Sequence, residues 1–369
     1  MTSQQVFRNT VIILVTAALA YVLLLSIRIW VVLLVAILIA SALRPVVVRL
    51  TGWRMPQGLA ILLVYILVGV LIASLLIGVL PPILNQIGNY IENDWQLANR
   101  IIVARDWGAQ FLNQNIGQDV ELPETEEIRS TISTIVGQIR RAIPTLLGEF
   151  SGVAGEAVLA FVIGVYWLTS RDSAVNFVLQ LFPITNREEV KETIDTIETS
   201  LGNYVRGVIL VASFVGIANF AILTMLRVPN AATLGFIIGV TTMLPVIGGF
   251  LGGGLAALLA LLTNPLHAVI TLATFVGVQQ IETHILTPRV MSRSVGIDPI
   301  LVIVTVFIGF TLGGVMGAII AVPIVGMIYI ILRRHVIEPR KASVSPYIIK
   351  DGLIVLNAQE EEAEAEKSL

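Results

Sequence analysis

The sequence places a carboxylate, Glu282, just beyond the apolar run 266–278, where Gln279 and Gln280 precede it. A charged side chain near the centre of a bilayer costs roughly 2.5–3.5 kcal/mol on insertion scales, so it usually faces a water-filled cavity or a partner. In that position Glu282 would bind a cation or carry a proton. The alternative is that Glu282 lies in water at the membrane interface and has no such role.

Other polar side chains are sparse within the apolar runs. Asn219 lies midway along the run 204–226, and Arg289 and Arg293 follow Glu282 closely enough to pair with it. Together with Glu282 and the glutamine three residues before it, Asn219 and Arg289 are candidates for binding a small polar solute or a monovalent cation.

The composition excludes several kinds of chemistry. Cys is absent, which removes disulfides, thiolate nucleophiles and Cys-ligated metals. The 3 His residues form no H-E-x-x-H pair and no G-x-x-x-x-G-K-S/T run is present, so neither a zinc hydrolase nor a P-loop ATPase is indicated. An intramembrane enzyme would need a positioned nucleophile or a second carboxylate, and no Asp lies in a long apolar run. We therefore expect no cofactor, no metal and no enzymatic activity.

The overall composition is that of a membrane protein. The 369 residues are 56% hydrophobic and 13% charged, against roughly 45–50% and 25% in soluble domains. The net charge of -2 offers no basic surface for nucleic acid. Several apolar runs approach or exceed the roughly 20 residues that cross a bilayer as a helix. The sequence therefore predicts an all-α, polytopic integral membrane protein with about eight membrane segments, embedded in the lipid bilayer.

Apolar and polar stretches divide the chain into four regions. We expect three membrane helices in residues 1–82, an amphipathic helical insert on the non-cytoplasmic side in 83–148, a membrane transport region in 149–335 with a cytoplasmic helix at 186–201, and a cytoplasmic, partly disordered tail in 336–369. Apolar residues in the insert recur at helical steps, which place them in one stripe on a helix.

Local signals predict where several elements begin and end. The runs 10–27 and 30–43 are expected to form a tight helical hairpin, and Pro81-Pro82 is expected to end the third membrane helix. The segment 185–188 fits the S/T-x-x-E capping box at the start of the cytoplasmic helix. Asp351-Gly352 predicts a tight β-hairpin in the tail.

The arginines predict the orientation in the membrane. Arg44, Arg49 and Arg54 lie in one loop without an acidic residue, and Arg333 and Arg334 follow the last apolar segment. Loops rich in positive charge remain in the cytoplasm. Both termini are therefore expected in the cytoplasm.

Two apolar segments, 231–262 and 299–332, are interrupted by glycine and proline. As single helices they would measure on the order of 48–51 Å, which is too long for one crossing of a core of about 30 Å and too short for two. Such breaks favour re-entrant hairpins, although two long, tilted spans are the alternative. The interrupting residues that we take as candidate binding or gating positions are Pro245, Gly248, Gly249, Gly253, Gly313, Gly317 and Pro323.

Pairs of interrupted membrane segments point to transporter binding sites, because the ends of half-helices offer free backbone groups. Free N–H groups favour anions and free C=O groups favour cations. Two opposed hairpins would meet near the midplane, where residues 248–254 and 313–317 would line one cavity. The alternative is that these glycines only allow helices to pack closely.

The order of motifs in the C-terminal half resembles one family. Pro245-Val-Ile-Gly248 precedes Glu282-Thr-His-Ile-Leu-Thr-Pro288-Arg289, and a later stretch ends in Ala321-Val-Pro323. This series is similar to the C-terminal signature of the autoinducer-2 exporter family, also known as PerM-like permeases. The likeness covers residues 5–340, without the acidic tail.

The resemblance implies a transporter in the bacterial inner membrane that forms a homo-oligomer. Some members of this family export the signal autoinducer-2, and others exchange sodium or lithium for protons. By matched motif, the candidate transport or gating positions are Pro245, Gly248, Glu282, Pro288, Pro299, Gly317 and Pro323.

Three functions are consistent with these observations. The first is a secondary transporter that exports a small polar solute, such as an autoinducer-2-like signal. The second is a sodium (or lithium)/proton antiporter in which Glu282 carries the proton. The third is a membrane scaffold without transport, in which the broken segments only pack.

Overall fold

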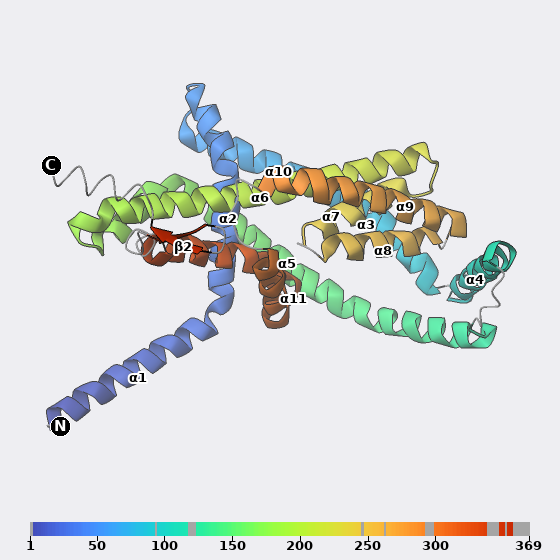
Figure 1. Cartoon of the computed structure of the whole chain (residues 1–369), viewed down its shortest axis with the longest axis horizontal. Coiled ribbons are helices and arrows are strands. Elements are labelled where there is room, and N and C mark those ends of the chain that lie inside the picture. The colour runs from blue at the N-terminus through green and yellow to red at the C-terminus, as the bar shows by residue number, and fades with distance from the viewer. Residues whose placement is uncertain are drawn as a thin grey trace.

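The computed structural model describes residues 3–92, 94–116, 123–244, 247–261, 263–291, 299–337, 347–350 and 353–356. Figure 1 shows that the described chain is built almost entirely of helices. Two residues singled out from the sequence, Pro245 and Arg293, lie outside the described residues, as does most of the predicted tail 336–369.

The first two helices are almost continuous. α1 spans Ser3–Leu25 and α2 spans Ile27–Gly52, with Ser26 alone between them. The backbone hydrogen bonds carry on through this residue, because Ser26 N–H donates to Val22 O at 2.9 Å. Figure 1 shows α1 running away from the rest of the molecule rather than back along α2. The predicted tight hairpin is therefore wrong, since a reversal of two helices needs a connection of about 2–5 residues.

Three long helices follow. α3 spans Gln57–Glu92, α4 spans Asp94–Ile116 and α5 spans Thr125–Gln180. The prediction that Pro81-Pro82 ends the third helix is wrong, because both prolines lie inside α3. A proline removes one backbone hydrogen bond, but its φ is already helical, so a helix can continue through it with a kink. α5 likewise runs without a break from the predicted insert into the predicted fourth membrane helix.

α6 spans Arg187–Met225 and combines the predicted cytoplasmic helix and the fifth membrane helix in one element of 39 residues. A short 3-10 turn, η1 (Ile184–Asn186), precedes it. The predicted capping box is wrong: Asn186 occupies the N-cap without a side-chain capping bond, and the Thr185 hydroxyl donates to Asn186 Oδ1 at 3.0 Å. The 3-10 turn places Thr185 one position before the cap.

The first interrupted segment folds as a helical hairpin, which we call hairpin 1. α7 spans Ala231–Thr242 and α8 spans Gly248–Leu261, so they are about 18 Å and 21 Å long. Neither is long enough to cross a hydrocarbon core of about 30 Å. The start of α8 packs against the end of α7, so the two helices are antiparallel.

The second interrupted segment, α11 (Pro299–Leu332), folds back on itself at Gly313 and Gly314, whose backbone is not helical. A Cβ on Gly317 would lie 2.0 Å from Gly309 O, whereas residues eight apart in a straight helix are separated by about 12 Å. We call this element hairpin 2. The folded shape of both segments is therefore the predicted one, and their entry and exit on one side of a membrane stays a prediction.

The remaining elements complete the C-terminal half. α9 spans Pro265–Ile281, the π-helical turn η2 spans Glu282–Leu286, α10 spans Thr287–Met291 and a second π-helical turn, η3, spans Arg333–Ile337. β1 (Tyr347–Lys350) and β2 (Leu353–Leu356) pair antiparallel in the register that places Lys350 opposite Leu353. This pairing is the β-hairpin predicted from Asp351-Gly352.

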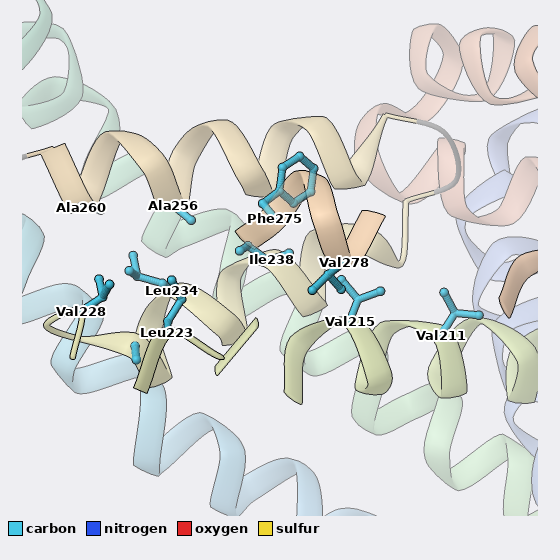
Figure 2. Close-up of a cluster of buried hydrophobic side chains, with 11 residues drawn as sticks. Val211, Val215, Leu223, Val228, Leu234, Ile238, Ala256, Ala260, Phe275 and Val278 are labelled. Atoms are coloured by element: carbon cyan, nitrogen blue, oxygen red, sulfur yellow. The ribbon is translucent and has the colours of Figure 1, made fainter. Parts of the chain in front are cut away.

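The largest buried core joins α6 and hairpin 1 to α9. Figure 2 shows Val215 of α6, Ile238 of α7, Ala256 of α8 and Phe275 of α9 gathered in one cluster. Within the described ranges, 6 helical stretches are long and apolar enough to cross a membrane, and the last of them is bent into hairpin 2. The prediction of an all-α, polytopic membrane protein is confirmed.

Candidate functional site

Pro288 shapes the backbone around Glu282. Because proline has no N–H and its ring clashes with the carbonyl four residues earlier, it distorts a helix just before itself. Here the distortion takes the form of η2, in which the N–H of Thr287 donates to Glu282 O, five residues back. Single π-helical turns of this kind are frequent at functional sites.

The π-helical turn brings Glu282 and Thr287 onto the same face of the helix. Thr287 Oγ1 donates to Glu282 Oε1 at 2.7 Å, and Gln279 Nε2 donates to Glu282 Oε2. Both carboxylate oxygens of this half-buried side chain therefore accept from neutral donors. A carboxylate has about four lone-pair sites, so sites remain for a cation or for a hydrogen-bond donor from a solute.

The amide oxygen of Gln279 faces hairpin 1. Oε1 of Gln279 is buried and has no hydrogen-bond partner within the described chain. A Cβ on Gly249 would lie 2.5 Å from this oxygen, so glycine leaves room for the amide to take this position where α8 begins. We call Gly249, Gln279, Glu282 and Thr287 the hairpin-tip site. An unpaired buried acceptor is costly, which marks this point as one where a donor or cation would be stabilised.

Other glycines of hairpin 1 allow close packing. A Cβ on Gly248 would lie 1.6 Å from Thr241 O, and one on Gly253 would lie 2.4 Å from the ring of Phe275. The interpretation that these glycines allow close packing therefore applies here, and their role in binding or gating stays a prediction. The glycines permit tight contact, and the contact sets the broken end of α8 against Gln279.

Hairpin 2 does not share this site. No described atom other than its own neighbours lies within 4 Å of a Cβ built on Gly313, and Leu312 beside it is 83% exposed. The contacts of the described residues therefore give no support to the expectation that residues 248–254 and 313–317 line one cavity. Gly317 contacts Gly309 within the hairpin, and Pro323 is fully buried.

Asn219 lies in the core of α6, with 0% of its surface exposed. Its Nδ2 donates to Val215 O at 2.9 Å, while Oδ1 finds no donor among the described groups. Nearby, a Cβ on Gly235 of α7 would lie 2.8 Å from Gly216 O. Asn219 is thus a second buried acceptor, at the contact of α6 with α7.

The three remaining candidate positions follow Thr287 in the chain. Arg289 and Pro288 are exposed in α10, and Pro299 is the first residue of α11. Glu282 accepts hydrogen bonds from Gln279 and Thr287, and its pairing with Arg289 stays a prediction.

A group of charged residues that the sequence reasoning missed lies at the other end of α6. Glu198 is only 5% exposed, and it accepts from Arg171 Nε at 2.6 Å, Arg44 Nη1 at 3.3 Å and Trp167 Nε1 at 3.0 Å. Arg171 also pairs with Asp195. A signal was present, because Glu198 follows the apolar Ile194 by four residues and so shares its buried face.

Arg206 adds a second polar contact about two turns further along α6. Pro45 lies inside α2 and has no N–H, so the carbonyl of Ser41 loses its helical donor. Arg206 Nη1 takes that place, donating to Ser41 O at 3.2 Å and to Ala42 O at 3.0 Å. We call Arg44, Trp167, Arg171, Glu198 and Arg206 the α6 clamp.

A shallow hollow lies away from both groups. It has a volume of about 300 Å³ and is lined by Asn99, Arg100, Val103, Leu261, Thr263 and Pro265. These residues come from α4 and from the turn between α8 and α9, so the hollow lies at the base of hairpin 1, not at its tip.

The fold has long apolar helices and two hairpins of broken helix, and the Glu282 carboxylate lies beside the tip of hairpin 1. These features are those of a multi-pass membrane protein of the transporter class. The chain belongs to the AI-2E transporter family, because the model described as AI-2E family transporter matches residues 11–337. The family resemblance seen in the sequence is thereby confirmed, and so is the general function of membrane transport.

Curated relatives carry transport names. The chain is 25% identical over 290 residues to "Putative transport protein YueF" of Bacillus subtilis (strain 168), which covers 76% of this chain and 78% of that protein. It is 25% identical over 306 residues to "Putative transport protein YrrI" of the same organism, covering 81% and 84%. A Mycobacterium tuberculosis relative is 34% identical over 170 residues, 46% of either chain. None of these names states a substrate.

Proposed function

We propose that this protein is a secondary transporter that exports a small, hydroxyl-rich polar solute, such as an autoinducer-2-like signal, and that it catalyses no reaction. The observation that carries the proposal is the buried Gln279 Oε1, which accepts from no donor of the described residues and lies beside the Glu282 carboxylate and against the broken end of α8. Oxygen acceptors held in an apolar setting bind O–H groups, and a hydroxyl-rich solute supplies several.

A second candidate function is sodium (or lithium)/proton antiport. Glu282 supports it, because a carboxylate with neutral neighbours can bind a monovalent cation and a proton in alternation. The buried amide oxygen of Gln279 is a further oxygen ligand for such a cation.

The test is transport by the purified protein in vesicles with an imposed proton gradient, given candidate signals, sodium or lithium separately. We expect solute efflux that falls at least about tenfold in Glu282→Gln and in Gln279→Leu, since each removes one hydrogen-bond acceptor of the site. Gln280→Leu is the matched control, because Gln280 is exposed on the same helix. Wild-type efflux in both site variants would refute the site, and ion-driven pH changes without solute flux would favour the antiporter.

We also propose that the protein lies in the bacterial inner membrane with both termini in the cytoplasm. Arginine-rich Arg44–Arg54 and the arginines after α11 support this orientation. Single cysteines can test it, because the natural chain has none. We expect Thr125→Cys to react from outside and Ser292→Cys only from the cytoplasm, and the reverse pattern would overturn the orientation.

Self-association is a further part of the proposal. Apolar side chains of α1, such as Phe7 (73% exposed) and Ile13 (67% exposed), have little contact with the rest of the chain. A second copy would cover them in the bilayer. Deletion of residues 3–25 should then reduce the mass of the purified particle measured by light scattering.

A further inference from the structure

The buried apolar side chains form separate clusters. One joins α2, α3 and α5 and includes Ala40, Ile61 and Leu168. Another joins α6, hairpin 1 and α9 and includes Val215 and Ile238. Between these two clusters, the first half of α6 lies against α2 and α5, where the side-chain hydrogen bonds of the α6 clamp surround the single fully buried apolar side chain of that stretch, Leu201.

The clamp is polar on both sides. Glu198 accepts from three donors on α2 and α5, and Arg206 donates to two carbonyls of α2. The backbones also touch here, since a Cβ on Gly202 would lie 2.5 Å from Ser41 O. Glycine at this position therefore lets α6 come close enough for the side chains to pair.

The polar character has an energetic consequence. The net free energy of a buried ion pair, relative to its separated and hydrated partners, is small because desolvation offsets the attraction. Separating an apolar contact always costs free energy in proportion to its area. The clamp is therefore the boundary along which the two clusters separate at the lowest cost, provided that water reaches the separated charges.

α6 connects this boundary to both hairpins. Tyr204 packs with Val306 and Val322 of hairpin 2, and Leu244 at the tip of hairpin 1 packs against the same group. Tyr204 follows Glu198 by six residues, a rise of about 9 Å along the helix. A helix moves largely as a rigid rod. A displacement of α6 at Glu198 would therefore be passed through Tyr204 to both hairpins.

We propose that the α6 clamp is a latch that opens and closes during transport, with Glu198 as a positioning residue that acts on the hairpin-tip site through α6. The closed clamp holds α6 in the arrangement described here. Its opening releases α6 from α2 and α5 and moves the tip of hairpin 1. This inference rests on the proposed transport function.

The first experiment measures opening without any transported solute. Ser41 is 7% exposed and its hydroxyl has no hydrogen-bond partner in the described chain, so Ser41→Cys is a mild reporter at the α2–α6 contact. We expect N-ethylmaleimide to label Cys at position 41 at least about tenfold faster in Glu198→Gln than with Glu198 intact, because Arg44 and Arg171 then lose the carboxylate that pairs with them. An exposed reporter, Ser130→Cys, should label equally in both backgrounds.

Asp172→Asn is the matched control. Asp172 also pairs with Arg171, at 3.2 Å, but its side chain is 91% exposed, against 5% for Glu198. Removing this exposed carboxylate should change labelling at position 41 by less than about twofold. Equal labelling in Glu198→Gln and in the parent, or an equal increase at positions 41 and 130, would overturn the latch.

A second experiment tests whether the latch must open. Arg44→Cys/Glu198→Cys can be joined by a reversible bifunctional thiol reagent, since the native side chains approach to 3.3 Å. We expect the cross-link to lower vesicle transport at least about tenfold and a reductant to restore it. Undiminished transport by the cross-linked protein would show a static contact. Because labelling needs no solute, the latch and the transport function can fail separately.

Discussion

The two hairpins were predicted by the same kind of sequence pattern, and they use it differently. In hairpin 1 the glycines are enclosed: Gly248 lies against α7 and Gly249 against Gln279. In hairpin 2 the glycines at the turn, Gly313 and Gly314, have no other described atom within 4 Å of an added Cβ. Only Gly309 and Gly317, in its two arms, are in close contact.

The difference separates two uses of glycine at a helix break. At the turn of hairpin 2, glycine supplies a backbone conformation, since Gly314 has φ 60° and ψ -146°. At the tip of hairpin 1, glycine supplies space, so that a helix end approaches a polar group. The second use places hydrogen-bonding groups beside a half-helix, and it is the one that suits solute binding.

The largest expected effect comes from filling the tightest space in hairpin 1. Gly248→Ala places a methyl group 1.6 Å from Thr241 O, so α7 and α8 must separate, at a cost of about 3 kcal/mol or more. The measurement is thermal unfolding of the purified protein in lipid discs. Gly254→Ala is the matched control, because nothing described lies within 4 Å of its Cβ, and alanine there should be neutral or slightly stabilising. Equal melting temperatures would contradict the packing of hairpin 1.

In hairpin 2 the arms should be sensitive and the turn should not. Gly317→Ala places a methyl group 2.0 Å from Gly309 O, which should cost about 2–3 kcal/mol by overpacking. Gly313→Ala, at φ -144° and with open space around it, should be tolerated. The same thermal unfolding measurement applies. A destabilised Gly313→Ala together with an unaffected Gly317→Ala would mean that α11 is not folded back at this point.

Much of the fold was predictable because the lengths of the apolar segments limit how each of them can cross the membrane. Segments too long for one crossing and too short for two, with glycine at the centre, have few solutions. α1 was not predictable, since whether a helix reverses or continues at Ser26 depends on one residue's backbone. The capping box failed for a similar reason, because a 3-10 turn shifted the cap by one residue.

The site was predictable only where its residues share a regular helical face. Gln279 and Glu282 are three apart and were found. Thr287 was missed because a π-helical turn, not an α-helical one, brings it beside Glu282. Arg206 was missed because its partner carbonyl becomes free only through Pro45, far away in the sequence.

At the hairpin-tip site, the space that Gly249 provides can be filled without breaking the hairpin. In Gly249→Ala the added methyl group would lie 2.5 Å from Gln279 Oε1, and the flexible amide can turn away with little loss of stability. We expect the melting temperature to stay within a few degrees while solute affinity falls about tenfold, the loss of one hydrogen bond. The measurement is the solute concentration at half-maximal transport. Unchanged affinity would separate Gln279 from solute binding.

The smallest effect is expected from backbone strain at the turn of hairpin 2. Gly314→Ala forces a side chain into φ 60° and ψ -146°, a region that only glycine occupies comfortably, at a cost of about 1 kcal/mol. Thermal unfolding of Gly314→Ala against Gly313→Ala measures that strain, since both substitutions add one methyl group to the same exposed turn. Solute affinity should not change, because this turn lies apart from Gln279 and Glu282. A loss of affinity without a loss of stability would instead show that hairpin 2 contributes to the binding site.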